Sequence, residues 1–314
     1  ACGQNFYKST NGGTSFTQIT SGITVTDVMR LAVTPANPSL VCVVQCAGSV
    51  FGKFYKSTNS GTSFTTTITG NSGNGTNFFG YDPNGSDNSG QGGYNIDITI
   101  SPADANEIHI GGIITWKSVD GGSTFVSTTE WDYPNSTGYT HCDMHALEYV
   151  GTKLYTGSDG GISVSTDNGG SFTPIGFGMG IRMFYRMGCA KTSATTIATG
   201  AQDNGGSVRK TTGWIDWIGA DGMEAAVDHT NANIIYGSSQ NGSFYRSTNG
   251  GTSFSNLNTP SSNGVWTTPF FIDPNVNTTL YVGYDELYKS TNSGGTWAAI
   301  SSIAIGDLEY IEVA

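Results

Sequence analysis

The sequence is poor in positive charge and in long apolar runs. It contains 13 Lys and Arg against 24 Asp and Glu, which gives a formal net charge of −11. Binding to nucleic acid needs a basic stripe, and none is visible. The longest apolar runs are a handful of residues, well short of the roughly 18–20 that a membrane helix needs. These absences argue against a nucleic-acid-binding protein and against a helical membrane span.

Signals for long helices and for several common catalytic loops are also missing. Apolar residues do not recur at helical spacing over several turns, and 45 glycines with abundant Ser, Thr and Asn oppose helices. The sequence has no phosphate-binding glycine loop before a helix and no Gly-x-Ser-x-Gly elbow. It starts at Ala1 without a leader, so we expect a mature or trimmed segment of a soluble protein.

The five cysteines follow no metal-binding pattern, because no Cys-x-x-Cys is present. Cys42 and Cys46 lie on one face of a predicted strand, roughly 13 Å apart at about 3.3 Å per residue, which is too far for a disulfide. We expect the cysteines to be small buried side chains, with at most one disulfide among them.

One phrase occurs six times, in the frame Ser-x-(Asp/Asn)-x-Gly-x-x-(Phe/Trp). The copies contain Ser9, Asn11, Gly13 and Phe16; Ser57, Asn59, Gly61 and Phe64; Ser118, Asp120, Gly122 and Phe125; Ser165, Asp167, Gly169 and Phe172; Ser247, Asn249, Gly251 and Phe254; and Ser290, Asn292, Gly294 and Trp297. The serines are 48, 61, 47, 82 and 43 residues apart. Since 82 is about twice the other spacings, one copy has been lost, and seven units of about 45 residues fit the length of four-stranded propeller blades.

The chemistry of the phrase explains its form. Asp or Asn accepts hydrogen bonds from nearby backbone N–H groups and closes a tight turn, in which glycine supplies a positive φ. The final aromatic residue starts the next strand and is expected to bury its ring between adjacent sheets. We therefore interpret these 24 residues as structural rather than catalytic.

The six phrases resemble the Asp-box (BNR) repeats of sialidase-, sortilin- and xyloglucanase-type β-propellers. The resemblance covers nearly the whole chain and implies an all-β fold, a single seven-bladed propeller of four-stranded antiparallel blades. The expected blades are 307–314 plus 1–20, 24–68, 94–128, 143–175, 181–217, 222–257 and 265–300. An inner strand over Leu308–Val313 is expected to pair with the first hairpin, which would close the ring.

Strand direction places a group of polar residues at one mouth of the predicted ring. His141, Asp143 and His145 alternate at the start of one inner strand and should share a side. Asp159, Gln202, Asp203, Asn204, Asp221 and Glu224 fall in loops or strand starts at the same end. Two long loops flank them, 69–94 and 126–140, and the second carries Trp131 and Tyr133.

This series also resembles a group of secreted bacterial propellers, mostly from Bacteroidota, that are usually labelled glycosyl-hydrolase-like or sortilin-like. The matching residues are Asp143, His145 and Ala146, then 159–161, 184–185, 202–205 and 221–222. The resemblance implies an extracellular or surface protein and export by type IX secretion. The Arg-Ile-Pro motif of sialidases is missing, and one ring supplies half of the cleft that xyloglucanases form between two propellers.

Three functions are compatible with these residues. We expect a recognition platform for a glycan or an extracellular protein, with His141, His145, Asp159, Gln202, Asn204, Glu224, Trp131 and Tyr133 binding the ligand. The alternative is a glycoside hydrolase in which Asp143 pairs with Asp203 or Asp221 as acid and base. The third is a structural subunit of an extracellular assembly. No cofactor or metal is predicted, although the carboxylates and amides would suit Ca²⁺.

Overall fold

The computed structural model describes residues 5–70, 73–133, 136, 138–261, 263–302 and 306–312. The chain divides into two compact units, Ala1–Gly180 and Ile181–Ala314, and each is described by itself. Every strand ladder in the described residues is antiparallel, and the one helical element is a 3₁₀ turn at Gln240–Gly242. None of the described helical structure is long and apolar enough to cross a membrane.

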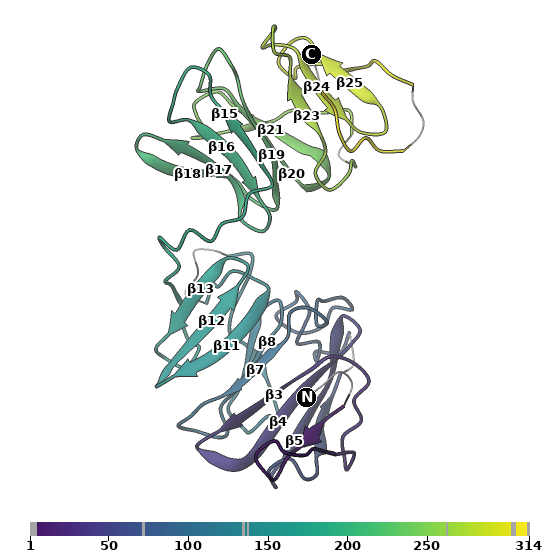
Figure 1. The fold of residues 1–314 in the computed structure, drawn as a ribbon, viewed down its shortest axis with the longest axis vertical. Coiled ribbons are helices and arrows are strands. Elements are labelled where there is room, and N and C mark those ends of the chain that lie inside the picture. The colour runs from purple at the N-terminus through teal and green to yellow at the C-terminus, as the bar shows by residue number, and fades with distance from the viewer. Residues whose placement is uncertain are drawn as a thin grey trace. The chain divides into compact units, whose positions relative to one another are not determined.

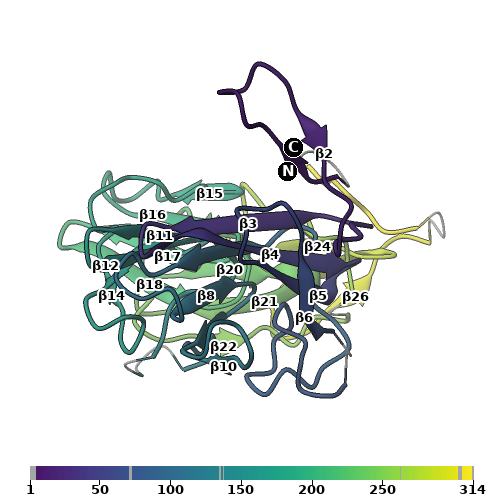
Figure 2. The ribbon, with the colours of Figure 1, turned by 90° about the horizontal axis from the view of Figure 1, so that it is seen from below.

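The first unit contains four sheets that follow one another along the chain (Figure 1). Their strands are β1 (Tyr7–Lys8) and β2 (Thr17–Gln18); β3 (Met29–Thr34), β4 (Asn37–Ala47), β5 (Val50–Ser57) and β6 (Thr65–Thr69); β7 (Asp97–Ile100), β8 (Ile108–Gly111), β9 (Thr115–Ser118) and β10 (Val126–Ser127); and β11 (Met144–Val150), β12 (Lys153–Ser158), β13 (Gly161–Ser165) and β14 (Thr173–Pro174). The β1–β2 hairpin projects from the sheet of β3–β6 (Figure 2).

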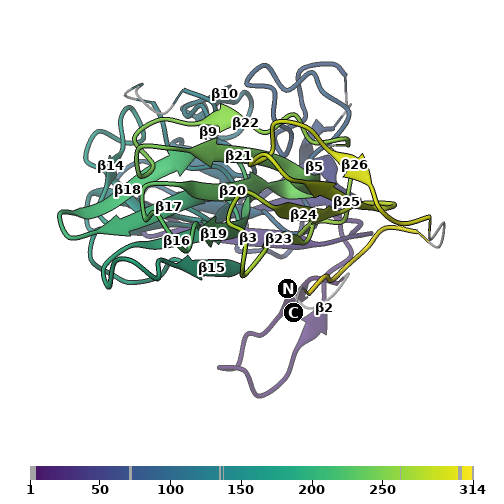
Figure 3. The same cartoon turned by 90° about the horizontal axis from the view of Figure 1, so that it is seen from above.

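The second unit contains three four-stranded sheets. Their strands are β15 (Arg186–Cys189), β16 (Ile197–Ala201), β17 (Gly205–Lys210) and β18 (Gly213–Ile218); β19 (Gly222–Val227), β20 (Ile235–Ser239), β21 (Ser243–Ser247) and β22 (Ser255–Asn256); and β23 (Phe270–Ile272), β24 (Leu280–Gly283), β25 (Leu287–Ser290) and β26 (Ala298–Ala299). The sheet of β23–β26 lies beside that of β19–β22 (Figure 3), and the Phe244 and Phe270 rings stack between them at 5.1 Å.

These seven antiparallel meanders confirm the predicted fold class, an all-β fold with the blade pattern of a seven-bladed propeller. Six sheets have four strands, and the first has two in the described residues. Six inner strands lie near the start of the blades expected from the sequence, namely β3, β7, β11, β15, β19 and β23. The apolar cores lie between consecutive sheets, as where Phe54, Ile110 and Trp116 join the sheet of β3–β6 to that of β7–β10.

The expected closing strand is not formed within the second unit. Residues 308–312 have no ladder with a strand of that unit, and the Leu308 N–H donates a single bond to the Tyr284 carbonyl at 2.7 Å. A strand needs a row of such bonds with a neighbour, so these residues are irregular. Ala1–Gln4, Val313 and Ala314 lie outside the described residues. The predicted pairing with β1–β2 would join the two units, and the closed single ring stays a prediction.

All six repeated phrases fold into the same turn. In the second copy, Ser57 Oγ donates to Asn59 Oδ1 and accepts from the Gly61 N–H, both at 2.9 Å. The same Asn59 oxygen accepts from the Ser63 N–H at 2.9 Å. The corresponding serine and glycine bonds occur in the other five copies. We call this unit the repeat turn; it satisfies its own backbone groups, as the structural interpretation expects.

The glycine of the repeat turn is required by its backbone conformation in every copy and by close packing in some copies, although a Cβ at Gly13 would meet no atom within 4 Å. It has a positive φ in all six copies, from 75° to 91°. In some copies it also packs closely on the preceding sheet, because a Cβ at Gly122 would overlap the Phe54 ring and one at Gly294 would overlap Leu257. A side chain at either of these two positions would therefore both strain the turn and separate two sheets.

In four copies, the Lys or Arg before the serine ties its sheet to the next repeat turn, a role the sequence did not indicate. The bonds run from Lys8 Nζ to Thr62 Oγ1 (2.9 Å), from Lys56 Nζ to the Gly121 carbonyl (2.9 Å), from Lys117 Nζ to the Asn168 carbonyl (2.8 Å) and from Arg246 Nη1 to the Ser293 carbonyl (2.8 Å). We call these bonds the cation ties.

Burial of the final aromatic residue is predicted correctly for only some copies. Phe64 and Phe172 are buried, but Phe16 is 65% exposed and Phe254 is 47% exposed. Phe16 lies in the two-stranded hairpin, which is too small to cover the ring. Phe254 contacts Trp217 and Tyr245 by edge-to-face geometry, which leaves part of its ring in solvent.

Cys42, Cys46 and Cys189 are free thiols, and no disulfide joins them to one another. Cys42 and Cys46 are buried, as expected, and burial raises the pKa of Cys42 to about 12. Cys189 is exposed, in contrast to the expectation, because it belongs to the edge strand β15, whose residues are mostly exposed.

Candidate functional site

Asp143 lies directly before β11 and is held by the backbone of the preceding sheet. Its N–H donates to the Ile113 carbonyl at 3.0 Å, and the Asn95 side-chain amide donates to its carboxylate. The side chain is buried, and burial raises the pKa of Asp143. The Asn95 Oδ1 atom is also buried and has no hydrogen-bond partner among the described residues. Asp143 is therefore an enclosed carboxyl group next to an unused amide oxygen.

The regular alternation predicted for Asp143 and His145 is not kept, but both side chains lie near Asp159. An Asp143 carboxylate oxygen is within 4.8 Å of an Asp159 carboxylate oxygen, and His145 Nε2 contacts that same carboxylate. Asp143 is buried, whereas His145 is exposed. Two local features break the alternation, since Asp143 has a φ of 66° and the ladder shifts register between Met144 and Ala146. A bulge of this kind sends neighbouring side chains in new directions.

His145, Asp159 and His141 nevertheless meet at one end of the β11–β14 sheet. His145 Nε2 lies 2.7 Å from an Asp159 carboxylate oxygen. The exposed Tyr94 ring packs edge-on against the His145 ring at 5.0 Å. His141 packs against Gly160, where a Cβ would overlap its side chain. The strand-direction argument therefore brings these three predicted residues together correctly.

In the second unit, Asp203 and Asp221 also come together. The Asp203 N–H donates to Asp221 Oδ1 at 2.8 Å, and the Asp221 N–H donates to Gln240 Oε1 at 3.2 Å. Asp203 has a φ of 58°, in the left-handed region. Part of the Asp221 carboxylate is thus used to hold the turn after β16. Pairing of Asp143 with Asp203 or Asp221 would join the two units and stays a prediction.

Glu224 and Arg186 form an ion pair on two neighbouring inner strands, β19 and β15. Arg186 Nε lies 3.3 Å from Glu224 Oε1, and the glutamate side chain is 16% exposed against 51% for the arginine. Burial raises the pKa of Glu224 to about 7, and the Arg186 charge opposes that rise. Near neutral pH this carboxyl group can therefore both give and take a proton.

A chain of hydrogen bonds lies beside this ion pair. Trp266 Nε1 donates to Tyr185 Oη at 3.2 Å, and that hydroxyl donates to Gln202 Oε1. Arg186 Nη1 donates to the Tyr185 carbonyl at 3.1 Å. Trp266 is 44% exposed. Gln202, Arg186, Glu224, Tyr185 and Trp266 together are called the Trp266 cluster.

Sequence reasoning missed three members of the Trp266 cluster. Tyr185 could have been predicted, since it lies in one of the motifs that resemble the bacterial propellers, but it was not named as a ligand-binding residue. Arg186 follows it directly. Trp266 is a single tryptophan in a loop rich in Ser, Thr and Asn, where no spacing marks it. Asn204, which was predicted, supports the cluster by donating to the Gln202 carbonyl at 3.1 Å.

Trp131 and Tyr133 are exposed, at 42% and 61%, on the second of the two predicted long loops. Trp131 contacts the first of these loops, because its ring lies 5.9 Å from the Tyr81 ring at an interplanar angle of 69°. The two loops therefore meet, and they present aromatic rings to solvent.

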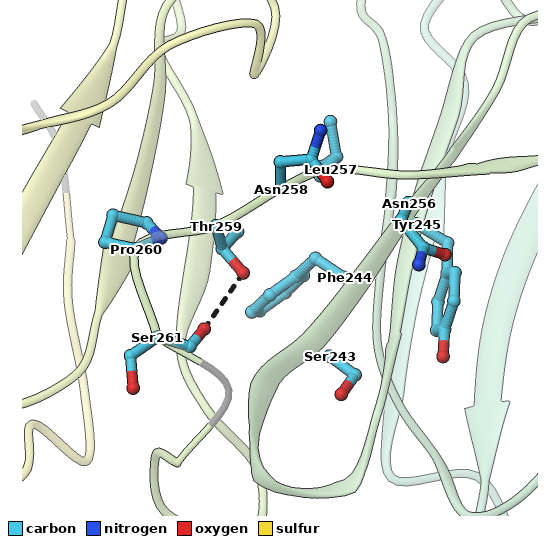
Figure 4. Close-up of a pocket in the computed structure, with 9 residues that line it drawn as sticks. All are labelled: Ser243, Phe244, Tyr245, Asn256, Leu257, Asn258, Thr259, Pro260 and Ser261. Carbon is cyan, nitrogen blue, oxygen red and sulfur yellow. Dashed lines mark hydrogen bonds between the residues drawn. The ribbon is translucent and has the colours of Figure 1, made fainter.

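An open groove of about 310 Å³ lies beside β21 and β22 (Figure 4). It is lined by Ser243, Phe244, Tyr245, Asn256, Leu257, Asn258, Thr259, Pro260 and Ser261. The Thr259 hydroxyl donates to the Ser261 carbonyl at 3.0 Å across one side. No Asp, Glu, Lys or Arg lines the groove, so it offers shape and neutral hydrogen bonds rather than acid–base chemistry.

No known family model matches the chain, and no curated protein sequence matches it. Among solved structures, it is similar to a GH74 enzyme of Niastella koreensis, with 16% identity, a TM-score of 0.36, and coverage of 88% of this chain and 59% of the other. A structure of YCF48 bound to D1 peptide gives 10% identity, a TM-score of 0.37, and coverage of 88% and 83%.

A third similar structure is PorZ, a surface component of the type IX secretion system of Porphyromonas gingivalis. It gives 11% identity, a TM-score of 0.28, and coverage of 86% of this chain and 32% of that one. The chain spans 59% and 45% of the two GH74 enzymes of Niastella koreensis and Xanthomonas campestris. At these identities the likeness concerns the β-propeller fold alone.

Proposed function

We propose that this chain is a secreted or cell-surface propeller of the Asp-box type that recognises a glycan through the Trp266 cluster. The proposal for the family rests on the six copies of the repeat turn, which share both sequence and hydrogen bonding. The proposal for the ligand rests on one observation: an exposed tryptophan is fixed in orientation by the hydrogen bond from its Nε1 to Tyr185 Oη at 3.2 Å.

A fixed, exposed indole is suited to a sugar. Its apolar face can cover the C–H face of a pyranose ring, and little conformational entropy is lost because the ring is already oriented. The Arg186–Glu224 pair and the Gln202 amide supply donors and acceptors for hydroxyl groups. A carbohydrate uses all three properties at once, which is why we favour it over an apolar ligand.

The test is a glycan-array screen followed by calorimetry on any ligand found. Trp266→Ala should abolish or strongly weaken binding, and Trp266→Phe should retain part of it because the ring face is kept. Trp131→Ala is a matched control, since it removes an equally exposed tryptophan from the first unit. Unchanged affinity in Trp266→Ala would reject this cluster as the glycan site.

The second candidate is glycoside hydrolysis, favoured by one specific observation. Glu224 is a buried carboxyl group with a pKa of about 7, the property required of an acid that protonates a leaving-group oxygen at neutral pH. Asp203 and Asp221, which lie in the same unit as Glu224, are the carboxylates that we propose as the base or nucleophile. Hydrolysis of plant or bacterial polysaccharides that is lost in Glu224→Gln, with binding retained, would favour the enzyme over the platform.

Protein recognition and a structural role in an assembly are proposed less directly. YCF48 carries a bound D1 peptide and PorZ is a component of a secretion system, so propellers of this general fold do serve protein partners. An extracellular or surface location, with export by type IX secretion, fits the scarcity of charged residues, which make up 12% of the chain. Cell fractionation of the native host tests that location.

A further inference from the structure

A second surface lies on the two long loops of the first unit, and its backbone is firmly held. Asn77, 1% exposed, accepts from the Phe51 N–H at 3.0 Å and donates to Asp87 Oδ1 at 3.1 Å and to the Ser89 carbonyl at 2.8 Å. Phe78 and Phe79 beside it are buried in the core. The residues that follow them are therefore presented from a fixed base.

Tyr81 projects from this base and meets Trp131. The Tyr81 N–H donates to Asp87 Oδ2 at 2.6 Å, and Gln91 Nε2 donates to the Tyr81 hydroxyl at 3.2 Å. Both ends of Tyr81 are therefore fixed. Its ring and that of Trp131 lie 5.9 Å apart at 69°, and they are 41% and 42% exposed. The two rings form a corner open to solvent, and the Tyr81 side of that corner is held in place.

The charge around this corner has one sign. Residues 70–96 and 126–140 contain Asp82, Asp87, Glu130 and Asp132 and contain no Lys, Arg or His. In the part of the chain that the structure describes, none of these four carboxylates is in an ion pair, and no cation lies over either ring. Glu130 and Asp132 flank Trp131 and are exposed.

We propose that this surface, formed by Tyr81, Trp131, Tyr133, Glu130 and Asp132, binds an arginine or lysine side chain of a protein partner. The electron-rich faces of the rings attract a cation, and carboxylates next to them strengthen that attraction. A neutral sugar could stack on the rings, but it carries no positive charge to complement the carboxylates beside them. Charge complementarity therefore selects a basic segment of a protein as the occupant.

This surface belongs to the first unit and shares no residue with the Trp266 cluster. Its ligand differs in charge and in class from the glycan proposed above. Either proposal can fail while the other holds, and the two tryptophan variants serve as controls for each other.

The test uses the full chain and a capped Arg-Gly-Arg-Gly-Arg peptide, with a citrulline peptide of the same length as the uncharged match. Calorimetry or tryptophan fluorescence at 50 mM NaCl should detect binding of the arginine peptide and a much weaker response to the citrulline peptide. Trp131→Ala should weaken binding by about 3- to 30-fold, the range expected for a cation over an aromatic ring. Binding should also weaken as NaCl rises to 300 mM.

Matched variants distinguish binding at this surface from general attraction of the peptide to a negatively charged protein. Tyr81→Phe keeps the ring and should bind like the parent, Asp132→Asn should bind less well, and Trp266→Ala should be unchanged. Equal binding of both peptides, loss in Asp132→Asn without loss in Trp131→Ala, or binding of cellohexaose that depends on Trp131 would each overturn the proposal. Absence of binding by the arginine peptide would overturn it as well.

Discussion

Replacing the serine of a buried repeat turn should cost far more stability than replacing the serine of an exposed one. Ser57 is 1% exposed, and its hydroxyl accepts from the Gly61 N–H at 2.9 Å and donates to Asn59 Oδ1 at 2.9 Å. In Ser57→Ala the Gly61 N–H stays buried without a partner. Leaving a buried donor unsatisfied costs about 1–3 kcal/mol.

Ser9 makes the same bond in the exposed hairpin, to the Gly13 N–H at 2.9 Å. Water can replace the hydroxyl there, so Ser9→Ala should change the free energy of unfolding by less than about 0.5 kcal/mol. The two substitutions remove identical atoms from identical turns. Their difference therefore measures the effect of burial alone.

Urea denaturation of the parent and the two variants gives the comparison, and thermal melts should show a shift of about 2–4 °C per kcal/mol for a unit of this size. Amide hydrogen exchange should also show faster exchange of the Gly61 N–H in Ser57→Ala. Equal losses in both variants, or no loss in Ser57→Ala, would refute the idea that burial makes this hydrogen bond important.

Three further outcomes follow from named contacts. The Glu224 carboxyl should titrate near pH 7 by carbon-detected NMR, and Arg186→Met should raise the pKa of Glu224 further, since the arginine charge lowers it. The folded pKa of Glu224 lies above the ordinary value of 4.5. The stability that protonation of Glu224 contributes should therefore be lost as the pH rises through about 7. Gly48→Ala should cost about 1–2 kcal/mol for its left-handed backbone, whereas Gly22→Ala should cost clearly more by urea denaturation, because its Cβ would overlap the Phe64 carbonyl oxygen. Burial lowers the pKa of His109 below 6.5, so the unfolded chain takes up a proton first, and the contribution of His109 to the free energy of unfolding should fall as the pH drops below about 6.5. Urea denaturation of a His109→Gln variant at several pH values should lack this contribution.

The sequence could predict the order of the sheets because the hydrogen bonds of the repeat turn join residues that are close in the sequence. Its serine, Asx and glycine satisfy one another within eight residues, so their spacing marks the third and fourth strands of each sheet. The gap between Ser165 and Ser247 was interpreted as a lost copy, and the sheet of β15–β18 lies there with a short turn at Lys210–Gly213. Long-range pairing has no such marker, which is why a strand over Leu308–Val313 was predicted where the second unit forms none.

The candidate site was predictable in outline but not in detail. Strand direction correctly brought His145 to Asp159 and Asp203 to Asp221, because it fixes which loops share an end of a sheet. It could not foresee the positive φ of Asp143, which depends on the contact with Asn95 and the preceding sheet. Trp266 was not predicted as a site residue, because a single aromatic residue in a loop belongs to no repeating sequence pattern. Its place in the cluster is seen only from its hydrogen bond to Tyr185.

The cation ties suggest how such a chain could grow. The donor lies in one copy of the phrase and the acceptor lies in the next, so duplicating a gene segment that encodes one sheet duplicates both halves of the fastening. A new sheet would carry a Lys or Arg donor for the next sheet and an acceptor for the previous one. The array could therefore lengthen without a compensating change elsewhere. The four ties share one arrangement, so each further sheet that carries the phrase would bring both partners of the bond with it.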